Sequence, residues 1–175
     1  MASILIAYYS MTGRTRPIAK EICRAMAADI EEIREPRRRE SLAGIWRSLI
    51  DAVTRRTTPI LIPVNDPANY DIVVVGGPIW AGRMASPVRA YAKRHLKQAP
   101  QVAFFCTAGG RKADAAFADL QHLCETAPRA TWLVDVNHLE PEAHRAELAH
   151  FVAQIRRALQ ADRAKISSEA VDRLA

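Results

Sequence analysis

The sequence has few cysteines, and they show no pattern that would form disulfides or bind a metal. Its 175 residues include only Cys23, Cys106 and Cys124. An odd number of cysteines without a CxxC spacing argues against a disulfide framework and against a zinc site. The five histidines also lack HExxH or any other ligand spacing. We therefore expect reduced, buried thiols and no bound metal.

The chain also lacks a long apolar run. No stretch approaches the roughly 18 residues that a membrane span needs. Residues 1–10, MASILIAYYS, lack the basic flank and cleavage site of a secretory signal. These absences predict a cytoplasmic protein.

The composition is that of an ordinary globular protein. Hydrophobic residues make up 49% of the chain and charged residues 25%. This balance and the length predict one domain over residues 1–175, with no internal repeat. Residues 162–175 either extend the last helix or fray.

Short apolar runs alternate with segments at helical spacing. Strands are predicted at 3–9, 70–77, 101–107 and 130–136, and a more polar edge strand at 29–35. Runs that are apolar almost throughout indicate strands buried on both faces, as in a parallel sheet. Helices are predicted at 14–28, 41–53, 84–97, 112–127 and 140–162. The alternation predicts a doubly wound α/β fold.

The loop after the first strand is built to hold an anion. It reads Ser10-Met11-Thr12-Gly13-Arg14-Thr15 and leads directly into a helix. Small residues, hydroxyl groups and a helix N-terminus together favour a phosphate. The alternative is that Ser10 or Thr12 only caps the helix. Neither GxxxxGK[ST] nor GxGxxG is present, which argues against a P-loop hydrolase and a dinucleotide-binding domain.

Two further loops follow predicted strands and carry unusual residues. The segment 76–91 reads GGPIWAGRMASPVRAY, with Trp80 at the tip of a predicted loop, and 106–112 reads CTAGGRK. In an open parallel sheet, ligands bind outside the carboxyl ends of the strands. An aromatic side chain there suits a flat conjugated ligand, although packing is the other interpretation of Trp80.

These loops resemble those of the flavodoxin family. Residues 10–15 look like its [ST]-x-T-G-x-T loop, which holds the phosphate of FMN. GGPIWAG is similar to its G-[ST]-P-x-W-[AG]-G loop beside the isoalloxazine ring, and TAGG at 107–110 is similar to its ring-edge loop. The resemblance implies a three-layer sandwich around a five-stranded parallel sheet in the order 2-1-3-4-5, with FMN as cofactor.

The resemblance also implies which residues surround FMN. Those around the phosphate would be Ser10, Met11, Thr12, Gly13, Arg14 and Thr15. Those around the ring would be Pro78, Ile79, Trp80, Ala81, Gly82, Arg83, Thr107, Ala108, Gly109 and Gly110. The chain departs from the family pattern at Arg14, where asparagine is frequent, and at Gly77, where a hydroxyl residue is common. No tyrosine in the third loop is available to stack on the second face of the ring.

The function that the resemblance implies is electron transfer, and three alternatives stay open. The chain is an FMN electron carrier between redox partners, or an FMN oxidoreductase that uses NAD(P)H or a quinone, including protoporphyrinogen-oxidase-like activity. The third alternative is a binding module without flavin, against which the intact first loop argues. No acid/base pair or nucleophile is visible in the loops, so we assign no catalytic residue. If Arg83 lies at the ring edge, its charge should favour the reduced, anionic flavin and two-electron behaviour.

The charge of the chain is unusual for the small electron carriers of this family, which are typically acidic. The formal net charge is +6, and residues 34–57 hold seven arginines against three acidic residues. This basic segment suits contact with an acidic protein or an anionic membrane surface, or its arginines are simply solvated. No recognised motif supports nucleic-acid binding. The apolar face of 41–53 is the predicted location of a dimer contact.

Overall fold

The structure, a computed structural model, is built on a parallel sheet whose strands appear in the order β2-β1-β3-β5-β6. It describes residues 2–36, 58–110 and 112–172. The five strands are β1 (Ile4–Tyr8), β2 (Asp29–Glu32), β3 (Ile72–Trp80), β5 (Val102–Ala108) and β6 (Thr131–Asp135). Because β4 is an extra short strand, this order is the predicted 2-1-3-4-5, and the predicted parallel pairing is confirmed.

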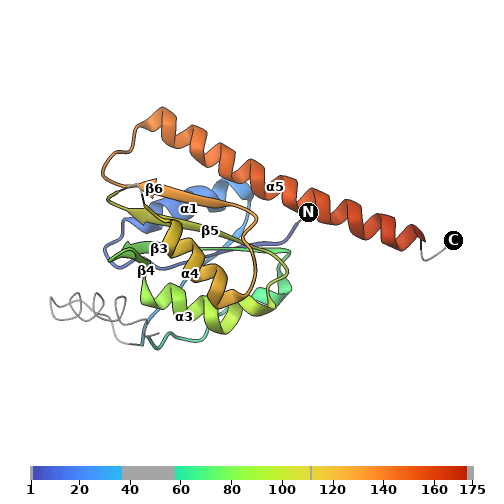
Figure 1. The fold of residues 1–175 in the computed structure, drawn as a ribbon, viewed down its shortest axis with the longest axis horizontal. Coiled ribbons are helices and arrows are strands. Elements are labelled where there is room, and N and C mark those ends of the chain that lie inside the picture. The colour runs from blue at the N-terminus through green and yellow to red at the C-terminus, as the bar shows by residue number, and fades with distance from the viewer. Residues whose placement is uncertain (1, 37–57, 111, 173–175) are drawn as a thin grey trace.

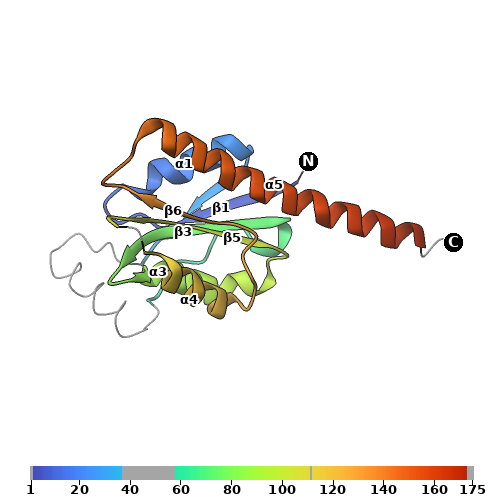
Figure 2. The same cartoon turned by 45° about the horizontal axis from the view of Figure 1, so that its top comes forward.

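Helices cover both faces of the sheet (Figures 1 and 2). Helices α1 (Thr15–Met26) and α5 (Pro141–Asp172) lie on one face, and α3 (Ser86–His95) and α4 (Asp114–Cys124) lie on the other. Two short 3-10 helices, η1 (Pro67–Asn69) and η2 (Leu96–Gln98), precede β3 and follow α3. The result is the three-layer sandwich that the sequence predicts.

Each face of the sheet has its own apolar core because successive strand residues point to opposite faces. In β1, Leu5 and Ala7 pack toward α3 and α4, whereas Ile4 and Ile6 pack toward α1 and α5. The central strands β1, β3 and β5 are buried on both faces. The edge strand β2 is only partly covered, as its polar sequence predicts.

The segment after β3 differs from the prediction. We expected a loop from Gly76 with Trp80 at its tip, but β3 continues to Trp80 and pairs with an antiparallel strand, β4 (Arg83–Met84). Ala81 and Gly82 form the turn, both with positive φ (47° and 76°). Two consecutive residues of positive φ form the tight turn that a two-residue hairpin needs. Helix α3 therefore begins at Ser86, two residues later than predicted.

Helix α5 is longer than the predicted 140–162. It runs to Asp172, so residues 162–172 continue the helix, and it extends well past the edge of the sheet (Figure 1). Leu159 is the last of its side chains described as buried. Among the described residues, no helix is both long and apolar enough to cross a membrane. The predicted helix at 41–53, with its dimer contact, and residues 37–57 of the basic segment lie outside the described residues.

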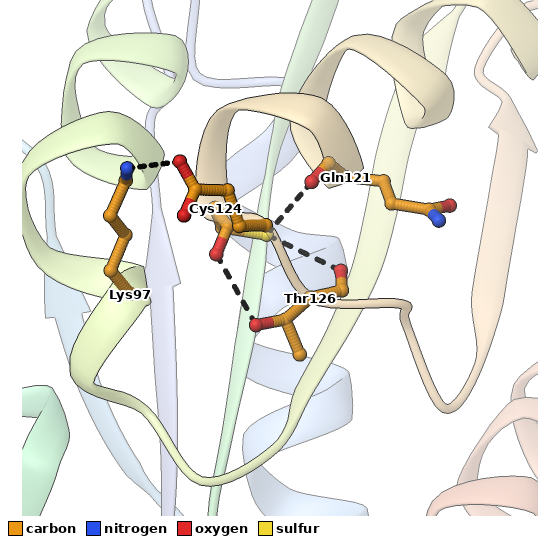
Figure 3. A network of polar contacts seen from close by, with 5 residues as sticks. Lys97, Gln121, Cys124 and Thr126 are labelled. Atoms are coloured by element: carbon orange, nitrogen blue, oxygen red, sulfur yellow. Dashed lines mark hydrogen bonds and ion pairs between the residues drawn. The ribbon is translucent and has the colours of Figure 1, made fainter.

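The C-terminal end of α4 is held by a compact network of polar contacts (Figure 3). The Cys124 thiol donates to the Gln121 and Thr126 carbonyls at 3.7 and 3.5 Å, and the Thr126 hydroxyl donates to the Cys124 carbonyl at 3.2 Å. Next to it, Lys97 and Glu125 form an ion pair. All three cysteines are free thiols, as predicted, with Cys106 and Cys124 buried and Cys23 half-buried.

Candidate functional site

The loop between β1 and α1 leaves the first turn of the helix without a side-chain cap. Arg14 stands at the N-cap position with helical angles (φ −68°, ψ −35°) and makes no capping hydrogen bond. The alternative in which Ser10 or Thr12 caps the helix is therefore wrong. The first amides of an uncapped helix are free donors at the positive end of its dipole. Gly13, just before these amides, has a φ of +87°. Glycine adopts this left-handed conformation readily, whereas a residue with a Cβ would be strained there.

Ser10 supplies a hydroxyl at the same place. Its Oγ is buried and has no hydrogen-bond partner among the residues that the structure describes. A buried hydroxyl without a partner costs free energy, so native proteins normally satisfy it. An oxygen of a bound phosphate would accept a hydrogen bond from the Ser10 hydroxyl. The orphaned hydroxyl and the uncapped amides together fit a phosphate group.

A pocket of about 770 Å³ opens beside this loop. It is lined by four of the predicted residues, Ser10, Met11, Thr12 and Gly13, and by their neighbours Tyr9 and Arg16. The rest of the lining comes from the end of β2 and beyond: Glu32, Ile33, Arg34, Glu35, Pro36 and Leu61. We did not predict Arg16 or the residues at 32–36 as site residues. The signal was available, because the order 2-1-3 places the carboxyl end of the second strand beside the first loop.

The two acidic side chains of this pocket already have partners. The Arg16 guanidinium donates to Glu32 Oε1 at 2.8 Å, and the Tyr9 hydroxyl donates to Glu35 Oε2 at 2.8 Å. Thr58 also donates to Glu35, at 3.2 Å. Arginine pairing and hydroxyl donation offset the negative charge of these carboxylates, so an anion in the pocket would face less repulsion.

The hydroxyl of Thr15 makes a contact that the sequence did not predict. Its hydroxyl lies 2.9 Å from the hydroxyl of Thr107, and both residues are buried. Thr15 begins α1, whereas Thr107 lies near the end of β5. The hydrogen bond therefore joins the first loop to the third, at the carboxyl edge of the sheet.

The hairpin after β3 is anchored at its aromatic end. The ring of Trp80 meets the ring of Tyr9 edge to face, with centroids 5.9 Å apart and an interplanar angle of 87°. The hydroxyl of Tyr9 is in turn held by Glu35. An edge-to-face pair leaves part of each ring for a further stacking contact. Trp80 thus packs against Tyr9, and because its side chain is only half-buried, part of its ring can still contact a ligand.

The glycine at position 77 has a packing reason. A Cβ there would lie 2.6 Å from Val88 Cγ2 and 3.4 Å from the Tyr9 carbonyl oxygen. Val88 of α3 fills the space that a side chain would need, so a hydroxyl residue at this position would require Val88 to move. The departure from the family pattern is therefore a consequence of how α3 packs on β3.

The third loop follows β5 and contacts the residues that directly follow β6. The Val136 amide donates to the Ala108 carbonyl at 2.9 Å, and a Cβ on Gly109 would lie 2.5 Å from Asn137 Nδ2. Cys106, just before this loop, is fully buried, and burial raises the pKa of its thiol to about 12. The interpretation of Cys106 as an inert core thiol is confirmed by this burial.

The structure brings all three predicted loops to the carboxyl edge of the sheet. Thr15 contacts Thr107, Tyr9 beside Ser10 contacts Trp80, and Pro78 is the register partner of Thr107. Arg14 is exposed, as are Thr12, Ala81, Gly82, Gly109 and Gly110. In the described part of the chain, no group of three or more histidine, cysteine or acidic side chains is arranged to hold a metal ion. This edge carries the uncapped N-terminus of α1 and the aromatic pair of Tyr9 and Trp80.

Comparisons with known proteins show that other proteins share this fold. Among the solved structures is a protein from Bacteroides eggerthii that is described as a proposed flavoprotein, 24% identical with a TM-score of 0.72, over 86% of this chain and 98% of that one. Another is a flavoprotein in complex with FMN from Lactobacillus acidophilus, 20% identical with a TM-score of 0.67, over 77% and 95% of the two chains. Among curated proteins, none matches the chain.

The sequence profile of a known family covers most of the chain. Residues 3–155 match the profile described as flavodoxin. This match spans all five parallel strands, the three loops at their carboxyl ends and α5 as far as residue 155. The chain belongs to the flavodoxin family.

Proposed function

We propose that the protein binds FMN and transfers electrons between redox partners. The observation that carries this proposal is the uncapped N-terminus of α1, beside the buried hydroxyl of Ser10, which has no partner in the part of the chain that the structure describes. Both donors would be satisfied by a phosphate monoester such as that of FMN. FMN supplies the redox chemistry when bound, whereas the chain supplies binding, orientation and electrostatics. A related structure, from Lactobacillus acidophilus, is an FMN complex.

Residues from the other two loops would surround the ring. Trp80 offers an aromatic surface, and the small residues at 107–110 allow a flat ligand to approach the backbone. Arg83, the cross-strand neighbour of Trp80, would place a positive charge near the ring. That charge would stabilise the reduced, anionic flavin more than the neutral oxidised one.

The test compares FMN with riboflavin, which has the same ring but no phosphate. Binding of each to the purified protein is followed by the quenching of flavin fluorescence. We expect FMN to bind tighter by at least about tenfold for each charge-assisted hydrogen bond to the phosphate. Equal affinities would exclude a phosphate site at the first loop. Failure to bind either flavin would reject the proposal as a whole.

The electron donor separates a carrier from an oxidoreductase. We propose a protein redox partner, and the alternative is direct use of NAD(P)H or a quinone. The FMN-loaded protein is mixed anaerobically with NADPH, and absorbance near the visible flavin band is followed. Slow or absent bleaching supports a carrier. Rapid bleaching, with reoxidation by an added quinone, supports an oxidoreductase instead.

The proposal also covers the cell compartment of the protein and the charge of its partner. Three free thiols are typical of a reducing compartment, so we propose the cytoplasm. The formal net charge of +6 favours an acidic partner protein. Cross-linking to a purified acidic redox protein at low and high salt would test this, since a charge-guided complex weakens as salt increases.

A further inference from the structure

A partly buried carboxylate on α4, that of Asp119, lies beside the hairpin that carries Trp80. Asp119 Oδ2 accepts a hydrogen bond from Arg89 Nε at 2.6 Å, and Asp119 Oδ1 lies 3.8 Å from Arg83 Nη1. The two oxygens of one carboxylate thus face two different arginines. Arg83 belongs to β4, Arg89 to α3 and Asp119 to α4, so three elements meet at this side chain.

The pair with Arg89 fixes the carboxylate. The Arg89 side chain is 3% exposed and that of Asp119 is 15% exposed. A guanidinium buried to this extent needs a carboxylate partner, because the cost of removing its charge from water is otherwise not offset. The Arg89 contact therefore determines where Asp119 lies and leaves Oδ1 directed at Arg83.

Arg83 is the more loosely held of the two arginines. Its side chain is 30% exposed, and its contact with Asp119 is a charge interaction longer than a hydrogen bond. Arg83 is also the cross-strand partner of Trp80 in the hairpin. A long, half-exposed arginine would sample many conformations without a fixed charge nearby.

We propose that Asp119 is a positioning residue, which holds the Arg83 guanidinium at the hairpin and so fixes the positive charge that bound flavin experiences. This inference rests on the proposed FMN function. Because Asp119 also pairs with Arg89, it orients Arg83 without fully cancelling its charge. A charge held in one place in a partly desolvated site acts more strongly than one that moves through solvent.

The test is a double-mutant cycle read out as the midpoint potentials of bound FMN. Arg83→Gln removes the charge, and we expect the potential for forming the fully reduced, anionic flavin to shift to a more negative value. In an Asp119→Asn background, the same Arg83→Gln change should produce a clearly smaller shift, because Arg83 is no longer held. A shift of equal size in both backgrounds would overturn the inference.

A matched control lies at the C-cap of the same helix. Glu125→Gln also removes one carboxylate, but Glu125 directly follows Cys124, the last residue of α4, and its partner is Lys97 (Figure 3). The Arg83→Gln shift should be unchanged in the Glu125→Gln background. A shift reduced as much as by Asp119→Asn would show that any loss of negative charge on α4 has the same effect, and would reject a positioning role.

A measurement on the wild-type protein without FMN tests the positioning separately from cofactor binding. Nitrogen-15 relaxation of the arginine Nε–H groups reports how restricted each guanidinium is. We expect Arg83 to be markedly more restricted than the exposed Arg94 of α3. Equal mobility of Arg83 and Arg94 would overturn the inference even if Asp119→Asn did not fold. If the protein failed to bind FMN while Arg83 was restricted, only the proposed function would be rejected.

Discussion

The hydroxyl of Thr15 lies 2.9 Å from the hydroxyl of Thr107, between residues 92 positions apart in the chain. One belongs to the first turn of α1, and the other lies next to the last residue of β5, which leads to the third loop. Both are buried, so the bond is shielded from competing water. It directly connects the phosphate end and the ring end of the proposed FMN site.

Thr107→Val should weaken both folding and FMN binding. The substitution keeps the shape and leaves the Thr15 hydroxyl buried without this partner, which costs about 1–3 kcal/mol of the free energy of unfolding. Urea unfolding measures that loss, and flavin fluorescence measures the dissociation constant for FMN. As a control, Thr126→Val removes a hydroxyl that donates to the Cys124 carbonyl at 3.2 Å, away from the site. FMN affinity equal in wild type and Thr107→Val would show that the two loops are not coupled.

Ser10→Ala should separate stability from binding. The Ser10 hydroxyl has no partner among the described residues, so its removal from the free protein should leave the free energy of unfolding unchanged or slightly higher. FMN affinity should fall by about 10- to 100-fold, as expected for a lost hydrogen bond to a charged group. Riboflavin serves as the internal control, because without a phosphate its affinity should not change. A variant that loses stability but keeps its FMN affinity would contradict this assignment.

Arg14→Ala should affect FMN binding only modestly. Arg14 is exposed at the N-cap of α1, and a charge in that position interacts with a phosphate through solvent. We expect an increase in the dissociation constant of less than about fivefold at low salt. The difference should disappear in high salt, because screening removes it. A large decrease in affinity that persists in high salt would instead indicate a direct contact with the phosphate.

The stability of the protein should decrease as the pH falls through the range in which His95 titrates in the unfolded chain. Burial, with a smaller contribution from Arg94, lowers the pKa of His95, whereas Asp66 and Glu31 act in the opposite direction. Unfolded His95 therefore takes up a proton near its ordinary pKa of about 6.5, and the folded side chain does so only at lower pH. The stability that neutral His95 contributes is present above that value and is lost below it.

His95→Gln should remove this part of the pH dependence. Urea unfolding at about pH 7.5 and about pH 5.5 would be compared for the wild type and the variant. The wild type should lose more stability on acidification than the variant does. The exposed His122 of α4 provides a control substitution, His122→Gln, which should behave as wild type. An identical loss in His95→Gln and wild type would show that His95 does not contribute.

The cysteines should react with iodoacetamide in the order of their exposure. Cys106 is fully buried with a pKa raised to about 12, and burial also raises the pKa of Cys124. Cys23 is half-buried on α1. At about pH 8, mass spectrometry should find Cys23 modified first, and the other two only after urea is added, because the thiolate is the reactive form. Modification of Cys106 as fast as Cys23 in the folded protein would contradict its core position.

The sequence was sufficient to predict the strands of the parallel sheet. In the predicted strand 70–77, residues 72–77 are all buried, because a central strand is covered on both faces. The first loop was predictable for the same kind of local reason, since Gly13 and the hydroxyl residues act within a few positions of one another. The β3–β4 hairpin was not, because the pairing of Trp80 with Arg83 depends on a turn whose first residue, Ala81, has no sequence preference for positive φ.

By itself, the sequence determined the fold class and the family and predicted an anion-binding loop after the first strand, because hydrophobic periodicity and short motifs are local properties of the chain. Only the tertiary structure decided what the side chains at that edge do. It turned the Thr15 hydroxyl toward Thr107 and placed Asp119 between Arg83 and Arg89. It also gave the Ser10 hydroxyl no partner within residues 2–36, 58–110 and 112–172. These contacts join residues far apart in the chain, and their geometry follows from how the helices pack on the sheet rather than from any pattern along it.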